Sequence, residues 1–303
     1  MKELVSFEHV TKIYNRKFKA LNDVSFKIGE GMFGLLGANG AGKTTLMKSL
    51  VTLNNPEKGR IIVDGYDTQK QGLEVRNIVG YLPQDFSIYP NLTAYEFLDY
   101  IAQINKINNS KVRKNKIEEV LEGVNLWQVK DKKVGGFSGG MKRRLGIAQA
   151  ILKDPKILIV DEPTAGLDPE ERIRFRMLLT EFSQNKCVIL STHIVEDIAS
   201  SCETIGFLNK GTLMYFGSPV DFIEKVRGKV KEFCISDRKE MLYLKNTYEI
   251  ISERRTSNGT FIRVIGDNLL NEVRGTLVEP NLEDAYMYYV KYDECREENI
   301  KHA

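Results

Sequence analysis

A glycine-rich segment near the N-terminus has the residue types and spacing of a phosphate-binding loop. Residues Gly37–Thr44 read GANGAGKT, which matches the pattern G-x-x-x-x-G-K-[ST]. Glycines let backbone amides turn toward phosphate oxygens without Cβ clashes, and the positive end of the following helix points at the same oxygens. In this pattern Lys43 contacts the β- and γ-phosphates, and Thr44 supplies a hydroxyl ligand for Mg²⁺. The segment therefore predicts a nucleoside triphosphate site.

Two consecutive acids follow an apolar segment much further along the chain. Ile157–Val160 is continuously apolar, and Asp161 and Glu162 come directly after it. A buried strand that ends in Asp can hold Mg²⁺ through a water molecule, so we expect Asp161 to lie beside Thr44. Glu162 would then lie near the γ-phosphate and polarise an attacking water. The pair predicts hydrolysis of the nucleotide.

A third motif stands shortly before these acids. The segment Phe137–Met141 reads FSGGM and opens a predicted helix. A Ser-Gly-Gly helix start offers a hydroxyl and free backbone amides, which are groups that bind phosphate.

The surrounding sequence predicts the elements that position these motifs. A strand, a glycine loop and a helix follow one another around Gly42, which is the order that a nucleotide-binding βα unit needs. Residues from about 90 to 153 read as helical, and Thr93 with Glu96 fits a capping box. An α/β core with a helical insertion is the simplest interpretation. The segments that we expect to form strands are Leu4–Val10, Val24–Ile28, Met32–Leu36, Arg60–Val63, Ile157–Val160, Val188–Ser191, Ile205–Leu208 and Leu213–Phe216.

The sequence changes character after about Asp221, where we expect a second domain. Tyr248–Arg255 and Thr260–Ile265 flank an Asn258-Gly259 pair, which is typical of a β-hairpin. Asp267–Val273 and Leu282–Val290 have helical spacing. These patterns predict a small α+β accessory domain.

Composition excludes several classes of protein. Hydrophobic residues make up 42% of the 303 residues and charged residues 28%, which is ordinary for a soluble globular protein. The net charge of +3 does not indicate nucleic acid as a partner. We expect neither a secretory signal nor a segment that spans a bilayer. The cysteines Cys187, Cys202, Cys234 and Cys295 have no paired spacing, which favours free thiols in a reducing cytosol.

Together, the three motifs resemble those of the nucleotide-binding subunit of ATP-binding cassette (ABC) transporters. The resemblance covers residues from about 3 to 220, with the motifs in family order. Residues Val278–Ala285, which read VEPNLEDA, look like the tail of bacterial ABC ATPases of the export type (ABC-2-like). The resemblance implies an α/β fold with a P-loop NTPase core in residues 1–220. That core would include an antiparallel β subdomain and a helical subdomain at about 85–153, and residues 221–303 would form the accessory domain.

The resemblance also implies roles for single residues. Tyr14 would stack on adenine, with Phe18 as the alternative. Gln84 would ligate Mg²⁺ and contact water, Asp168 would couple the two sites of a dimer, and His193 would contact the γ-phosphate. Catalysis is thereby assigned to Glu162, His193, Gln84 and Lys43, and metal binding to Thr44, Gln84 and Asp161. The predicted nucleotide contacts are Tyr14, Gly37, Asn39, Gly40, Ala41, Gly42, Lys43, Thr44, Thr45, Ser138, Gly140 and Asp168.

Two positions of the FSGGM segment depart from the family pattern Leu-Ser-Gly-Gly-Gln. Phe137 replaces Leu and keeps an apolar anchor, whereas Met141 replaces Gln and removes an amide that could reach the nucleotide. The basic run that follows, Lys142 to Arg144, is interpreted as a solvated helix face, with a phosphate or dimer contact as the alternative.

The family implies two copies that sandwich two ATP molecules with Mg²⁺, as a homodimer or a heterodimer. The resemblance implies a separate polytopic membrane protein as partner, and a cytoplasmic location on the inner face of the cell membrane. Nucleic acid is not expected. The main prediction is an ATPase that powers export, and the residues do not identify the cargo. The alternatives are an import ATPase with a regulatory C-terminal domain and a soluble ATPase that acts on ribosomes or nucleic acid.

Overall fold

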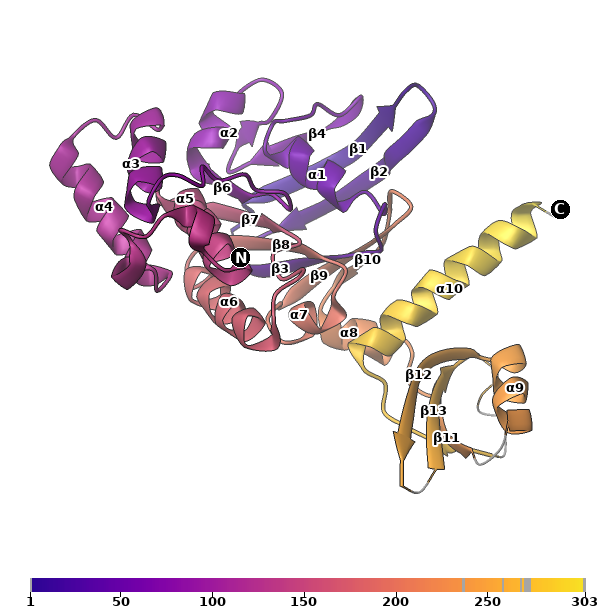
Figure 1. Cartoon of the computed structure of the whole chain (residues 1–303). Coiled ribbons are helices and arrows are strands. Elements are labelled where there is room, and N and C mark those ends of the chain that lie inside the picture. The colour runs from indigo at the N-terminus through magenta and orange to yellow at the C-terminus, as the bar shows by residue number, and fades with distance from the viewer. Residues whose placement is uncertain (1, 236–237, 258, 268, 270–273, 302–303) are drawn as a thin grey trace. The chain divides into compact units, whose positions relative to one another are not determined.

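The structure is a computed structural model that describes residues 2–235, 238–257, 259–267, 269 and 274–301 (Figure 1). Contacts divide the chain into two compact units, Met1–Phe216 and Gly217–Ala303. Each unit has its own cluster of buried apolar residues. The division falls a few residues before the boundary at 220 that we expected.

A four-stranded antiparallel sheet opens the first unit, with the strand order β2-β1-β4-β5. It is the antiparallel β subdomain that the resemblance implied. Its strands cover the predicted strands of this region and add one more, β5. The strands are β1 (Val5–Tyr14), β2 (Phe18–Ile28), β4 (Lys58–Val63) and β5 (Tyr66–Asp67).

A six-stranded sheet forms the rest of the core, in the order β10-β9-β3-β8-β7-β6. The pairs from β9 to β6 are parallel. Strand β7 is buried along its whole length, as expected for a parallel strand with both faces covered. The strands are β3 (Gly31–Leu36), β6 (Val79–Leu82), β7 (Ile157–Asp161), β8 (Cys187–Thr192), β9 (Thr204–Asn209) and β10 (Thr212–Gly217).

The register of this sheet brings the predicted motifs to one edge. Leu36 lies opposite Thr192, Asp161 opposite Ser191, and Leu82 opposite Val160. The residues that follow these strands are therefore neighbours, although the sequence separates them widely. This edge is where ligands bind in open parallel sheets.

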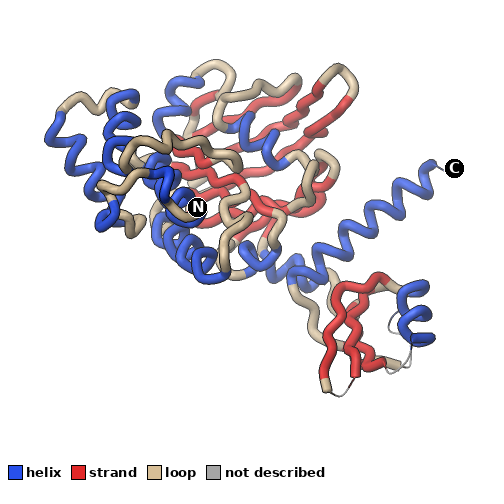
Figure 2. Tube along the Cα trace, in the orientation of Figure 1, coloured by secondary structure: helices blue, strands red, loops and turns tan. Residues whose placement is uncertain are grey.

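Helices cover the sheet and form a separate cluster beside it. Helix α1 contacts β2 and β4 of the first sheet and β7 of the second, so it joins the two sheets (Figure 2). Helices α3, α4 and α5 gather at the β6 side, which confirms the helical insertion (Figure 1). Thr93 and Glu96 form the predicted capping box at the start of α3. The helices are α1 (Lys43–Leu50), α2 (Gly72–Ile78), α3 (Ala94–Ile104), α4 (Ser110–Gly123), α5 (Gly139–Ile151), α6 (Pro169–Phe182) and α7 (Val195–Ala199), with short 3₁₀ turns at Trp127–Val129 and Val134–Gly136.

The core of the first unit lies where the two sheets and α1 meet. The rings of Phe7 and Phe26 stack with centroids 4.5 Å apart, and Phe33 follows at 5.6 Å from Phe26. Leu46 and Met47 of α1 belong to the same buried cluster. Burial of these side chains fixes the start of α1, and with it the phosphate loop, against both sheets.

Among its described residues, the second unit has a four-stranded antiparallel sheet, β12-β13-β11-β14, and the helices α8, α9 and α10. Strands β12 and β13 form the predicted hairpin, in which Thr256 pairs with Gly259, while Asn258 itself lies outside the described residues. Most of the predicted helix Asp267–Val273 also lies outside them. The elements are α8 (Pro219–Glu224), β11 (Val230–Ile235), α9 (Arg238–Thr247), β12 (Glu249–Thr256), β13 (Gly259–Ile265), β14 (Thr276–Leu277) and α10 (Leu282–Lys301).

The VEPNLEDA segment has a structural role in this second unit. Arg263 of β13 donates to both carboxylate oxygens of the fully buried Asp284, at 2.9 and 2.6 Å. The side chains and backbones of Asn281 and Asp284 also cap each other at the start of α10. The segment thus fastens α10 to the sheet.

Within the described part of the chain, no helix combines the length and the apolar character that crossing a bilayer requires.

Candidate active site

The phosphate loop joins β3 to α1 in a conformation that requires glycine. Gly42 stands at the N-cap of α1 with φ of 106°, a left-handed conformation that other residues rarely adopt. A Cβ atom at Gly37 would lie 2.4 Å from the carbonyl oxygen of Leu208. The loop therefore has this shape because its residues carry no side chain at these two points.

The side chain of Lys43 is buried against the phosphate loop. It is 5% exposed, and its Nζ donates to the carbonyl oxygens of Gly37 at 2.6 Å and Ala38 at 3.2 Å. Nζ also lies 3.2 Å from Oε1 of Glu162. The cation is thus held in place by the loop, with a carboxylate as its nearest anion.

Glu162 occupies a strained backbone position at the end of β7. Its φ is 49°, and its backbone N–H donates to the carbonyl oxygen of Ser191 at 2.8 Å. A positive φ outside glycine costs about 1–3 kcal/mol, and such strain persists where the surroundings fix it. The conformation directs the carboxylate between Lys43 and His193, whose Nδ1 lies 2.7 Å from Oε2. The structure thus joins the two residues that we expected to act on the attacking water.

A cavity of about 350 Å³ opens above the phosphate loop. It contains Gln84 and Glu162, which follow β6 and β7 on the far side of β8, so the sheet edge brings them to the phosphate loop. Gly37 and Ala41 are buried behind the loop rather than lining the cavity. The lining residues are Phe18, Ala20, Ala38, Asn39, Gly40, Gly42, Lys43, Thr44, Thr45, Gln84 and Glu162.

The groups around Asp161 fit a divalent cation. Asp161 is fully buried, and neither of its carboxylate oxygens has a hydrogen-bond partner among the described residues. Burial, together with the charge of Asp161, raises the pKa of the neighbouring Tyr81. Within the described chain, no group of three His, Cys, Asp or Glu side chains could bind a metal alone. The unpartnered carboxylate of Asp161 fits Mg²⁺, which usually takes one or two protein carboxylates and completes its shell with water and phosphate oxygens.

Ser138, Gly140 and Asp168 do not line the cavity of Lys43. Ser138 is exposed at the N-cap of α5, where its Oγ accepts from the backbone N–H of Met141 at 3.1 Å. Asp168 is exposed and caps α6 by accepting from the backbone N–H of Glu171. Within one chain, Ser138 and Asp168 therefore have capping roles and remain open to a second molecule, whereas Gly140 is buried in the first turn of α5 against Glu171.

The two aromatic candidates lie at the same end of the β1–β2 hairpin. Tyr14 and Phe18 are paired across the strands. Phe18 is 60% exposed and lines the cavity, whereas the hydroxyl of Tyr14 accepts from Asn54 at 2.9 Å. The alternative that we named, Phe18, is therefore the aromatic side chain that faces the phosphate loop.

The prediction of a solvated helix face at Lys142 to Arg144 is wrong for both arginines. Arg143 donates to the carbonyl oxygens of Pro83 and Gln84, and Arg144 donates to the carbonyl oxygen of Val124. Burial lowers the pKa of the Arg143 guanidinium, against the opposing effect of nearby carboxylates. Arg143 and Arg144 stand three and four residues after Gly140 and so share its helix face, but only the structure shows that Gly140 is buried.

Sequence reasoning also missed a buried contact between Thr164 and Asp197. Thr164 Oγ1 donates to Asp197 Oδ2, and the two residues are 1% and 2% exposed. The contact ties the segment after Glu162 to helix α7, which begins just after His193. No motif marks either residue, since the contact joins a turn and a helix that only the fold brings together.

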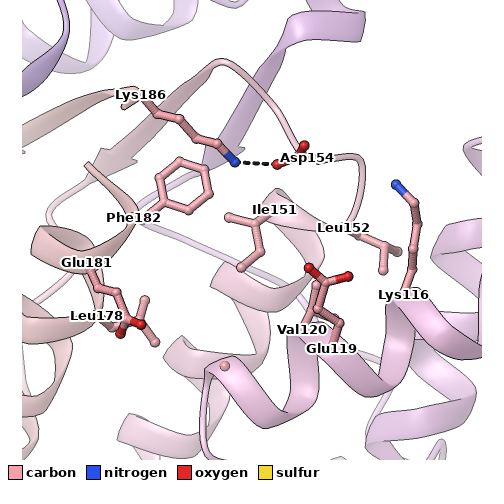
Figure 3. Close-up of a pocket in the computed structure, with 11 residues that line it drawn as sticks. Lys116, Glu119, Val120, Ile151, Leu152, Asp154, Leu178, Glu181, Phe182 and Lys186 are labelled. Carbon is pink, nitrogen blue, oxygen red and sulfur yellow. Dashed lines mark hydrogen bonds and ion pairs between the residues drawn. The ribbon is translucent and has the colours of Figure 1, made fainter. Parts of the chain in front are cut away.

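A second cavity, of about 280 Å³, lies between α4, the end of α5 and α6 (Figure 3). The cavity is lined by the apolar side chains of Val120, Leu152 and Phe182, and by an ion pair between Lys186 and Asp154. It holds none of the predicted site residues.

Known proteins resemble this chain along most of its length. The family model described as ABC transporter matches residues 21–165. The chain is 33% identical to the bacitracin transport ATP-binding protein BcrA of Bacillus licheniformis, and the match covers 96% of this chain and 97% of that protein. It is also 33% identical to the Nod factor export ATP-binding protein I of Rhizobium etli, over 93% of this chain and 92% of that protein. A dimeric ATP-binding cassette solved with ADP and phosphate has a TM-score of 0.65 and 26% identity, and covers 71% of this chain and 98% of that one.

Proposed function

The chain belongs to the family of ABC transporter ATP-binding proteins and hydrolyses ATP, and from this premise we propose that it powers export through a separate membrane-spanning protein. The observation that carries the proposal is the extent of the match to the bacitracin transport and Nod factor export proteins. Both matches cover more than nine tenths of this chain, so they include the second unit as well as the core.

In this proposal, the side chains around the phosphate loop act in hydrolysis by attack of water on the γ-phosphate. Lys43 would leave Glu162 for the phosphate oxygens and neutralise charge that develops on them. Glu162, released from Lys43 but still beside His193, would accept a proton from the attacking water. His193 would hold that water and the γ-phosphate through its imidazole. The short contact between His193 Nδ1 and Glu162 Oε2 supports a joint role for these two side chains.

Mg²⁺ belongs to the proposal because of the residues around Asp161. Asp161, Thr44 and Gln84 would hold the cation, Asp161 through water. The bound cation would draw charge from the β- and γ-phosphate oxygens. The unpartnered, buried oxygens of Asp161 support this assignment, since a buried carboxylate without a partner is costly.

We further propose a dimer in which each ATP contacts the phosphate loop of one chain and Ser138 with Gly140 of the other. The exposure of Ser138 and Asp168, away from the cavity of their own chain, supports this arrangement. The dimeric relative solved with ADP and phosphate supports it as well. ATP in the interface would stabilise the closed dimer, and hydrolysis of that ATP would allow the dimer to open. Adenine would stack on Phe18, with Tyr14 beside it.

The assembly would work at the inner face of the cell membrane, where its membrane-spanning partner lies. Residues 221–303 would act as an accessory domain of the same chain. The purification described next also tests whether the assembly contains two copies of this chain, as a homodimer, or one copy, as part of a heterodimer.

Affinity purification from native membranes tests the function. The bait is the Glu162→Gln variant with Mg-ATP, and mass spectrometry identifies the proteins that bind. We expect a polytopic membrane protein at near-equal stoichiometry. A periplasmic or lipid-anchored binding protein in the same complex would favour import, and ribosomal or DNA-bound partners without a membrane protein would overturn transport.

A further inference from the structure

The segment after β6 is held by very few polar contacts. Residues Pro83 to Ile88 make no backbone–backbone hydrogen bond among the described residues. Proline has no N–H, so Pro83 ends the pairing of β6 with β7. The segment carries Gln84, which lines the cavity above the phosphate loop. Its position therefore depends on side chains from elsewhere.

Arg143 supplies the hydrogen bonds that this segment receives in the described structure. Its Nη1 donates to the carbonyl oxygen of Gln84 at 2.8 Å and to that of Pro83 at 3.3 Å. Below it on the same helix, Gly146 leaves room for the ring of Phe86, because a Cβ there would lie 2.9 Å from that ring. Helix α5 is thus the support of the Gln84 segment.

The same guanidinium also reaches the end of β7. Its Nη2 lies 3.4 Å from the carbonyl oxygen of Glu162, the residue with the strained backbone. Guanidinium is a planar group with five donors in fixed directions, so it can bind two backbone segments at once, which an ammonium group does less well. The Arg143 guanidinium also interacts electrostatically with three carboxylates, those of Asp85, Asp161 and Glu162.

We infer that Arg143 is a positioning residue for ATP hydrolysis, which holds the Gln84 segment and the Glu162 backbone in a fixed relation to the helix that begins at Ser138. Its side chain does not line the cavity above the phosphate loop. A change at the start of α5 would therefore reach Gln84 and Glu162 directly through one side chain. The kinetic part of this inference depends on the proposed function, but the structural part does not.

A spin label tests the structural part without nucleotide. The label is attached to Ser87→Cys, an exposed position of the segment, in a Cys234→Ser, Cys295→Ser background. Cys187 and Cys202 are buried and can stay. We expect Arg143→Gln to increase the mobility of the label. Lys142→Gln is the matched control, because it removes the same charge from the preceding position of α5. Among the described residues, the Lys142 side chain has no hydrogen bond or ion pair.

ATPase kinetics test the catalytic part. We expect Arg143→Gln to lower kcat about tenfold or more, with KM for ATP within about threefold of the wild type. Arg143→Lys keeps the charge but not the fork, so its kcat should also stay several-fold low. Lys142→Gln should match the wild type. If Arg143→Gln does not fold, as judged by thermal melting, Arg143→Lys alone carries both measurements.

The outcomes separate this inference from the proposed function. A wild-type chain without ATPase activity would overturn the proposed function, and the spin label would still report on the segment. An active wild type with an equally active Arg143→Gln variant would overturn the inference. So would an unchanged label mobility, or full restoration of kcat by Arg143→Lys.

Discussion

The ammonium group of Lys43 lies 3.2 Å from Oε1 of Glu162, and each of the two side chains is 5% exposed. In this state, the cation of the phosphate loop is paired with the carboxylate that we assign to the attacking water. Under the proposed function, we expect the γ-phosphate to replace Glu162 at Lys43 and to release Glu162 to act as a base. This pairing would then link nucleotide binding to the formation of a competent site.

Glu162→Gln should bind ATP at least as tightly as the wild type and lose turnover. The amide keeps the shape of the side chain but removes the charge that competes with phosphate for Lys43, and it cannot accept a proton. We expect kcat to fall by about a hundredfold or more, measured by phosphate release beside nucleotide titration. Glu170→Gln, an exposed acid of α6, is the control. Ordinary hydrolysis by Glu162→Gln would contradict the role of Glu162.

Lys43→Ala should lose nucleotide affinity by about tenfold or more, because the phosphates lose a buried cation. It should also unfold more easily, by a free energy of about 3 kcal/mol, because Glu162 stays buried without Lys43. The double variant Lys43→Ala, Glu162→Gln should regain stability but not affinity. Urea unfolding and nucleotide titration measure the two effects, and unchanged ATP binding by Lys43→Ala would show that this loop does not hold the phosphates.

Ser138→Arg should bind ATP but fail to form the closed dimer. The exposed hydroxyl of Ser138 would be replaced by a bulky cation at the proposed interface. The same change also removes the cap of α5, which is worth about 1 kcal/mol. Ser138→Ala removes the cap alone and should still dimerise in Mg-ATP, which size-exclusion chromatography in a Glu162→Gln background can measure. A closed Ser138→Arg dimer with normal turnover would refute the contact between subunits.

Local sequence signals predicted much of this fold, but they did not predict the contacts between segments that are distant in the sequence. The Thr93 capping box and the strand before Asp161 depend on neighbours in sequence, so the pattern was sufficient. The sheet edge that joins Gln84 to Glu162 was not predicted, because β6 was not among the predicted strands and its parallel pairing with β7 joins distant segments. Arg143 could not be assigned from local signals either, because its partners lie on two other segments and its charge is typical of an exposed face.

The second unit shows the same division. The β12–β13 hairpin was predicted from its turn, whereas helix α9 was not predicted. Among the residues of α9 whose burial the structure describes, only Leu244 is buried, and a helix with so few buried residues gives a weak periodic signal. The VEPNLEDA segment was recognised by resemblance, but its physical role depends on Arg263, which no local pattern connects to it.

Arg263→Ala should destabilise the second unit by about 3–5 kcal/mol, because it leaves the fully buried carboxylate of Asp284 without its partner. Arg255→Ala is the control, since Arg255 is 85% exposed and its ion pair should contribute little. Replacing both partners, as Arg263→Met with Asp284→Leu, should restore most of the loss. Urea unfolding of the full chain measures the effect, with ATP present to identify the transition of the first unit. We expect only the transition that ATP does not shift to move to lower urea. Equal loss in Arg255→Ala, or a shift of the ATP-sensitive transition alone, would show that the Arg263–Asp284 pair does not fasten α10 to its sheet.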